Sequence, residues 1–279
     1  MVPVSTTVFC MISLLVSLVL PVALLLIFAA KNRKQGIVSA WLLGAAGFFV
    51  TQILVRVPIL TALQSQPWFL NLYQKHLFAY AFGLAFTAGL FELAGRFAVA
   101  KLMRKRLTVK RSLAAGLGHG GIEAMVLIGM TYVNNLLYIF MINSGTFDAL
   151  FAQVAGNQLA VAQLEMIRQQ LLTTPPAMFL LGGFERILAM TAHTAMSMLV
   201  CYGIAHKKAL PCTLVCLGIH TFIDLTAGFS QLAGSALSQT TVYSIVYAIL
   251  VIVAVASLYI IRGLRRRWNE TEVPHDPEV

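Results

Sequence analysis

Charged residues, and acidic ones above all, are scarce in this sequence. Only 11% of its 279 residues are charged, and ten in all are Asp or Glu. Soluble globular domains carry about 25% charged residues, so this composition excludes an ordinary soluble protein. The hydrophobic share of 59% and the mean hydropathy of +0.82 indicate instead that most of the chain lies in lipid.

Polar segments long enough to form a soluble domain are also missing. An α-helix needs about 20 apolar residues to cross a bilayer, and seven stretches meet that length. We place these spans at residues 5–30, 37–63, 77–100, 112–142, 176–205, 209–230 and 240–262. The first lacks the basic residues that precede a signal-peptide core, so we interpret it as a span. The sequence therefore predicts an all-α polytopic membrane helix bundle, a single domain over residues 1–279 that ends in a short cytoplasmic tail at 263–279.

One connecting segment has a pattern of its own. Between the fourth and fifth spans, residues 144–174 alternate apolar and polar side chains, with Phe147, Phe151 and Leu171 among the apolar ones. Such spacing is typical of an amphipathic helix that lies along the membrane interface. Two threonines and two prolines then precede the fifth span and should end that helix.

Cysteine is rare, and all four cysteines fall in apolar stretches, which argues against a disulfide framework. They are Cys10, Cys201, Cys212 and Cys216. The last two share a helical stripe with His220 and Asp224, at spacings of four residues. We interpret these cysteines as small apolar residues and not as metal ligands.

Basic residues are confined to alternate loops. Fifteen of them follow the odd-numbered spans, whereas the other loops hold only Lys75 and Arg168. The fifteen are Lys31, Arg33, Lys34, Lys101, Arg104, Lys105, Arg106, Lys110, Arg111, Lys207, Lys208, Arg262, Arg265, Arg266 and Arg267. The positive-inside rule then predicts a multi-pass protein of the cell membrane, with its N-terminus outside and its C-terminus in the cytoplasm. The net charge of +10 faces an anionic leaflet, so the lipid bilayer is the expected partner and nucleic acid is not.

Seven acidic or histidine side chains nevertheless fall within the predicted spans. They are Glu92, Glu123, Glu185, Asp224, His119, His193 and His220. An ionisable group at bilayer depth costs several kcal/mol unless it is paired, protonated, hydrated or bound to a metal. We therefore predict that most of them converge on one polar site inside the bundle.

Helical spacing groups these residues into pairs. Glu92 and Arg96 lie one turn apart on the third span and can form an ion pair. His119 and Glu123 share a face of the fourth span at the same spacing, which lets two side chains reach one metal ion. Glycines surround His119 and remove side-chain bulk beside it. A structural role remains open for both pairs.

The later spans carry a further histidine and a third pair. His193 lies on the fifth span, eight residues after Glu185. That separation is about 12 Å along a helix, so we expect Glu185 to be a structural ion-pair partner of Arg186, Arg96 or Arg56. His220 and Asp224 form the third pair at four-residue spacing, on the sixth span.

The order of these motifs resembles the PrsW and CAAX-protease-like (CPBP) superfamily of intramembrane proteases. Within it, the phrases AGLFELAGR, GLGHGGIEA, FERILAMTAHTAMS and GIHTFID are similar to the YhfC family of intramembrane metalloproteases. The resemblance covers residues 75–230. It implies an intramembrane endopeptidase whose catalytic positions here are Glu92, Arg96, His193, His220 and Asp224.

The sequence also departs from the superfamily pattern. The first motif often holds two adjacent glutamates, and Phe91 stands at the first of these positions. In the prenyl-protein branch the last motif ends in Asn, which can donate a hydrogen bond to an oxyanion, whereas an ionised Asp224 cannot. Asp224 is therefore better suited to orient a histidine or to bind a metal.

Two chemical routes to peptide hydrolysis fit these residues. In the first, Glu92 and His193 activate water directly, and His220 stabilises the oxyanion. In the second, a divalent metal ion, with zinc as the first candidate, is held by side chains of four residues while Glu92 acts as base. Those four are His119, Glu123, His193 and His220. The sequence does not separate the two routes.

Other functions can be built from the same cluster of polar side chains. Intramembrane His, Asp and Glu also make proton relays and ion pathways in transporters, and a non-catalytic membrane protein could hold such a cluster as well. Inverted repeats and paired broken helices, which are typical of transporters, are missing from the sequence. We therefore favour a peptidase that acts on a membrane-associated protein or peptide, and keep an ion, proton or metal transporter as the alternative.

Overall fold

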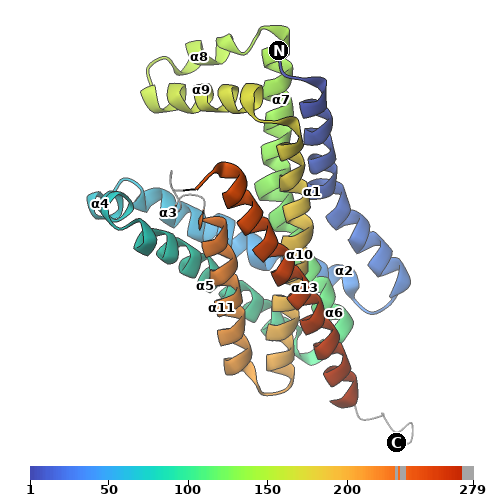
Figure 1. Cartoon of the computed structure of the whole chain (residues 1–279). Helices are drawn as coiled ribbons and strands as arrows, with labels where there is room; N and C mark the ends of the chain where they lie inside the picture. Colours follow the sequence, from blue (N-terminus) through green and yellow to red (C-terminus); the bar gives the residue numbers. More distant parts are fainter. Residues whose placement is uncertain (230–231, 233–236, 272–279) are drawn as a thin grey trace, which may run out of the picture. The chain divides into compact units, whose positions relative to one another are not determined.

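The computed structural model describes residues 1–229, 232 and 237–271, apart from the side chains of 269–271. Within these residues every regular element is helical (Figure 1). The α-helices are α1 (Val4–Lys31), α2 (Ile37–Phe48), α3 (Val57–Leu63), α4 (Pro67–Lys75), α5 (Leu77–Met103), α6 (Val109–Glu123), α7 (Met130–Ser144), α8 (Asp148–Val154), α9 (Gln158–Thr173), α10 (Phe179–Ala205), α11 (Ala209–Ala227) and α13 (Gln239–Thr271). Two π-helical segments, η1 (Phe49–Arg56) and η3 (Ala124–Gly129), join consecutive α-helices, and short 3₁₀ turns occupy Arg104–Arg106 and Pro176–Met178.

Seven of the helical stretches are long and apolar enough to cross a membrane, which confirms the predicted fold class. They run over Val4–Lys31, Ile37–Leu63, Leu77–Arg106, Val109–Ser144, Pro176–Ala205, Ala209–Ala227 and Gln239–Trp268. The last extends beyond the predicted end at residue 262, because the arginine-rich segment continues the helix. The tail at 272–279 and part of the sixth predicted span, at 230, lie outside the described residues.

The chain divides into two compact units, each built from two stretches of sequence. Unit 1 comprises Met1–Ala23 and Ala124–Ile187, and unit 2 comprises Leu24–Glu123 and Leu188–Val279. All the site residues predicted above, apart from the structural partner Glu185, fall within unit 2. The prediction of one integral membrane domain stays a prediction.

In unit 2, four helices pack tightly because small residues line their contacts. Helix α2 packs against α6 and α5, and α5 packs against α11. A side chain at Gly118 would collide with the backbone of Trp41, and one at Gly95 would come within 3.0 Å of the Gly47 carbonyl carbon. The glycines around His119 therefore allow the close helix contact that their number predicted.

In unit 1, two hydroxyl groups hold the start of α10. Oγ of Ser13 donates a hydrogen bond to the carbonyl oxygen of Phe179 at 2.7 Å, and the hydroxyl of Tyr132 donates to the same oxygen. The backbone amide of Gly183 in turn donates to Oγ of Ser13 at 3.3 Å. Ser13 thus bridges the carbonyl of Phe179 and the amide of Gly183, the two groups that a regular hydrogen bond in the first turn of α10 would join.

The sequence predicts one interfacial helix between the fourth and fifth spans, and the structure has two. Residues 144–174 form α8 and α9, which pack against each other (Figure 1). Gly145 adopts a φ of 74° at the end of α7, a conformation that favours glycine. The break between α8 and α9 falls at a glycine, followed by Asn157, whose side chain caps α9 by accepting a hydrogen bond from the Ala160 amide.

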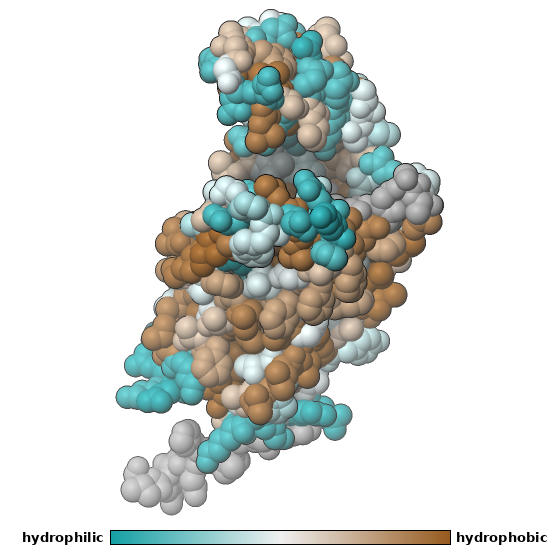
Figure 2. Space-filling view, turned by 90° about the vertical axis from the view of Figure 1, so that its left-hand side faces the viewer, coloured by the Kyte–Doolittle hydropathy of each residue, from teal (hydrophilic) through white to brown (hydrophobic). Residues whose placement is uncertain are grey.

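Apolar side chains cover much of the exterior. Leu26, Phe78, Phe140 and Ile252 are each more than 60% exposed. Figure 2 shows a broad zone of hydrophobic residues on one face, with hydrophilic residues gathered below it. Exposure on this scale is unfavourable in water and is expected where lipid is the solvent. The four cysteines are buried and free.

Candidate active site

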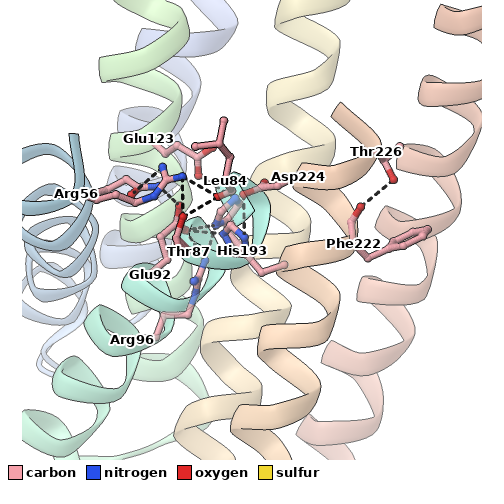
Figure 3. A network of polar contacts seen from close by, with 12 residues as sticks. Arg56, Leu84, Thr87, Glu92, Arg96, Glu123, His193, Phe222, Asp224 and Thr226 are labelled. Atoms are coloured by element: carbon pink, nitrogen blue, oxygen red, sulfur yellow. Dashed lines mark hydrogen bonds and ion pairs between the residues drawn. The ribbon is translucent and has the colours of Figure 1, made fainter. Parts of the chain in front are cut away.

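Glu92 lies at the centre of a buried polar cluster inside unit 2. It projects from the middle of α5 and is 3% exposed. Arg96, one turn further along the same helix, donates from Nη2 to its Oε2 at 3.1 Å. The i, i+4 spacing therefore produces the ion pair that the sequence predicted. The pair is visible at the left of the cluster in Figure 3.

Two histidines from other helices meet the same carboxylate oxygen. Nε2 of His119, on α6, lies 2.9 Å from Oε2 of Glu92, and Nε2 of His220, on α11, lies 2.8 Å from it. Both rings are almost completely buried. Because a carboxylate only accepts hydrogen bonds, both Nε2 atoms carry a proton in this arrangement.

His193, on α10, completes the cluster from a third direction. Its Nδ1 lies 2.6 Å from Nη2 of Arg96 and 3.6 Å from Oε2 of Glu92. Arginine has no acceptor, so it donates to Nδ1, and the ring proton is on Nε2. That nitrogen lies 2.8 Å from Oε2 of Glu123. The ring of His193 also stacks on that of His119, with centroids 5.5 Å apart.

Glu123 and Asp224 occupy the outer side of two histidines. Glu123 contacts the nitrogen of His193 that points away from Glu92, and Oδ2 of Asp224 lies 3.3 Å from Nδ1 of His220. A carboxylate in this position fixes the orientation and tautomer of an imidazole. The side chain of Asp224 is 32% exposed, whereas that of Glu92 is 4% exposed. Asp224 therefore marks the accessible side of the cluster.

Glycines explain why the histidine-bearing helices can come this close. A Cβ atom at Gly120 would lie 3.0 Å from Cβ of His193, and one at Gly89 would lie 3.4 Å from Cβ of His220. Both distances are tighter than most real side-chain contacts. A larger residue at either position would push a histidine away from Glu92. The first of these glycines belongs to the GLGHGGIEA phrase, and the second lies just before Glu92.

Sequence reasoning missed one member of the cluster. Nε2 of Gln52 donates to Oε1 of Glu92 at 3.0 Å, and Gln52 is only 7% exposed. It lies in η1, where the π-helical winding alters which side chains face α5. A buried glutamine in an apolar span was a readable signal, but an uncharged amide costs less to bury than a charge. We had looked only for ionisable groups.

The ligand atoms of this cluster fit a divalent metal ion. One ligand atom each of Glu92, His119 and His193 lie within 4.8 Å of one another, and Nε2 of His220 reaches the same carboxylate oxygen. Imidazole nitrogen and carboxylate oxygen are the ligands that zinc prefers next to thiolate. The carboxylates beside His193 and His220 match the outer partners of metal-binding histidines. Glu123 is not in this close group, and its Oε2 lies 2.8 Å from Nε2 of His193; its role as a ligand stays a prediction.

Glu185 has an ion-pair partner of its own. It belongs to unit 1, where it forms an ion pair with Arg186. The expected structural pairing with Arg186 is therefore present. Of the predicted site residues, the structure brings Glu92, Arg96, His119, His193 and His220 into direct contact. It adds Glu123 and Asp224 at the edge.

Comparison with known proteins assigns the chain to a family. The model of the YhfC intramembrane metalloprotease family matches residues 16–268. Among curated proteins, the chain is 32% identical over 212 residues to the "Uncharacterized membrane protein YhfC" of Bacillus subtilis (strain 168), which covers 75% of this chain and 80% of that protein. No solved structure matches. The chain belongs to the YhfC family, as its motifs predicted.

Proposed function

We propose that this protein is an intramembrane endopeptidase that hydrolyses a peptide bond of a membrane-associated protein or peptide. One observation carries the proposal. A single buried oxygen, Oε2 of Glu92, has a guanidinium nitrogen at 3.1 Å and two imidazole nitrogens at 2.8 and 2.9 Å. Burying so many polar groups away from water costs free energy, which indicates that the cluster has a function. Acid–base catalysis is a function that these side chains can perform. The family to which the chain belongs carries the name of this activity.

Each side chain has a chemical role in this proposal. Glu92 takes the proton from the attacking water, because it is the carboxylate on which the cluster converges. Arg96 holds Glu92 ionised and occupies Nδ1 of His193. His220 lies between the carboxylates of Glu92 and Asp224, which orient its imidazole so that it can stabilise an oxyanion.

A divalent ion, with zinc as the first candidate, fits the same residues. His119, His193, His220 and Glu92 would hold it, and Glu123 and Asp224 would orient two of the histidines. Such an ion supplies Lewis acidity and eases the deprotonation of water. If Glu92 is one of the ligands, its carboxylate would both bind the ion and act as the general base. The buried position excludes bulk water from the reacting groups in either case.

The proposal is tested by measuring bound metal and peptide cleavage on the same protein. Full-length protein is purified in detergent, its metal content is determined, and it is incubated with membrane-anchored peptides. We expect cleavage that is lost in His220→Ala. If the ion takes part, His119→Ala and His220→Ala should both lower the metal content, whereas in the direct route only His220→Ala should reduce turnover strongly.

The matched control is His206→Ala, which removes an imidazole that stacks on Tyr202 outside the cluster. It should change neither metal content nor turnover. Absence of cleavage with all peptides, together with a metal content or ion flux that depends on His119, would contradict the peptidase proposal and favour the transporter.

We also propose that the N-terminus lies outside the cell and the C-terminus in the cytoplasm. The proposal rests on the asymmetry of fifteen against two basic residues between alternate loops. Ser144 and Lys105 are both exposed; Ser144 ends the fourth span, and Lys105 lies near the end of the third span, just before the fourth begins. In intact cells a membrane-impermeant thiol reagent should label Ser144→Cys and leave Lys105→Cys unlabelled. The reverse pattern would overturn the orientation.

A further inference from the structure

Arg56 is a second guanidinium beside the cluster, and the roles described above do not use it. It lies at the end of η1, one turn after Gln52, and its side chain points toward α5 and the cluster (Figure 3). Nη2 of Arg56 donates to the carbonyl oxygen of Leu84 at 2.7 Å and lies 3.4 Å from Oγ1 of Thr87. Nη1 lies 3.5 Å from Oε1 of Gln52. The side chain is therefore drawn inward and does not extend to the membrane surface.

All of these contacts are to neutral groups. Within the described residues, no carboxylate lies within ion-pair distance of Arg56, although Arg96 and Arg186 each have one. Its Nε is buried and without a hydrogen-bond partner in the same residues. A guanidinium inside a membrane span normally pairs with an acid, because an isolated charge there is expensive. Arg56 therefore has charge and donors to offer to a molecule that enters the site.

The position of Arg56 connects it to the reacting groups. It interacts electrostatically with Asp224 and Glu92, and Gln52 links it to Oε1 of Glu92 through an amide. Arg56 and Asp224 are both partly exposed, while Glu92 is buried. Arg56 thus lies on the accessible side of the cluster. Arg96 differs from Arg56 because its side chain is only 1% exposed and its Nη2 contacts both Glu92 and His193.

We propose that Arg56 binds a carboxylate of the peptide substrate and thereby selects where the chain is cut. The proposal rests on the peptidase function proposed above and names its substrate class. Arginine presents parallel donors that match a carboxylate. Leu84 and Thr87, which hold the guanidinium, precede Glu92 on α5 by eight and five residues. Gln52 bridges the two side chains, with contacts of 3.5 Å to Nη1 of Arg56 and 3.0 Å to Oε1 of Glu92, so the guanidinium lies within about 9 Å of that carboxylate.

This distance determines how many residues separate the recognised carboxylate from the bond that is cleaved. An extended peptide advances about 3.3–3.6 Å per residue, so the carboxylate should lie within about three residues of the bond that is cleaved. An acidic side chain or a free C-terminal carboxylate can supply it. Both present the same chemistry to Arg56, and an experiment can distinguish them.

The experiment compares matched membrane-anchored peptides in two assays. The first set moves a single Glu, or Gln in its place, through successive positions around the cleaved bond, and the second ends in either a carboxylate or an amide. Cleavage is measured with the full-length wild type, Arg56→Gln and Arg56→Lys. Binding is measured with fluorescent versions of the same peptides on the Glu92→Gln variant, with and without Arg56→Gln, so that recognition is read without turnover.

We expect the best-placed acidic peptide to be preferred over its neutral partner about tenfold, which corresponds to about 1.4 kcal/mol. Arg56→Gln should reduce this ratio to about one, and Arg56→Lys should keep part of it. Preference in only one peptide set identifies the source of the carboxylate. Arg33→Gln, in an exposed loop segment, is the control that should leave the ratio unchanged.

Two results would overturn the inference. One is equal binding of acidic and neutral peptides to protein that retains Arg56. The other is a preference that persists in Arg56→Gln. If no peptide is cleaved at all, the peptidase proposal fails, but the binding assay still decides whether Arg56 recognises a carboxylate. If Arg56→Gln does not fold, the partial preference expected of Arg56→Lys decides the question.

Discussion

Two Glu–Arg pairs lie in membrane helices of this protein, and they differ in their spacing along the helix, in their burial and in their neighbours. Glu92 and Arg96 are four residues apart on α5, with side chains 4% and 1% exposed. Glu185 and Arg186 are neighbours on α10, with side chains 30% and 8% exposed. The first pair lies in unit 2 among three histidines and the second in unit 1.

The difference shows how spacing changes the use of the same two side chains. Residues four apart on a helix share a face, so Glu92 and Arg96 point together toward α6, α10 and α11. Adjacent residues diverge by about 100° around the axis, so Glu185 and Arg186 meet only through the reach of their side chains. Because they share a face, the charged groups of Glu92 and Arg96 can act together at one point, which a reaction centre requires. The adjacent pair is suited to neutralising charge.

The largest expected effect on activity is that of Glu92→Gln. The amide keeps the size of the side chain but cannot accept a proton from water, so turnover should fall by about 10²–10⁴-fold. Cleavage of a membrane-anchored peptide is measured together with the midpoint of thermal unfolding. Full activity in a folded Glu92→Gln protein would remove Glu92 as the base and with it the main support for the peptidase proposal.

A smaller loss is expected when the support of Glu92 is removed. Gln52→Met retains bulk in η1 but loses the hydrogen bond to Oε1 of Glu92. A hydrogen bond to a charged group contributes roughly 1.5–3 kcal/mol, so kcat should fall about ten- to hundredfold while KM changes little. Gln64→Met, at an exposed position just after the end of the same span, serves as the control. An unchanged kcat with a lowered unfolding temperature would show that Gln52 is only structural.

The smallest effect on activity is expected for Glu185→Gln. Because the Glu185 side chain is partly exposed, breaking this pair should cost less than the roughly 3–5 kcal/mol of a fully buried pair. Turnover per folded molecule should stay at the wild-type value, and the unfolding temperature should drop modestly. A loss of turnover comparable to that of Glu92→Gln would erase the distinction between the two pairs.

Much of this arrangement was predictable from local patterns. Apolar length identified seven spans, and four-residue spacing identified the Glu92–Arg96 and His220–Asp224 contacts. Other features were missed for physical reasons. Gln52 carries no charge and lies in a π-helical segment, and α8 and α9 form a pair because the chain turns between them. Regular α-helical periodicity predicts neither feature.

The sequence by itself determined the membrane class, the helices and the faces on which ionisable side chains lie. Those properties follow from hydrophobic length and from the geometry of one helix. The tertiary structure alone decided that Glu92 would be the shared partner of Arg96, His119, His220 and Gln52, and that Glu123 would stand behind His193. Contacts between helices depend on rotation and depth, which are set by close packing at positions such as Gly89 and Gly120. Spacing along one chain does not contain that information.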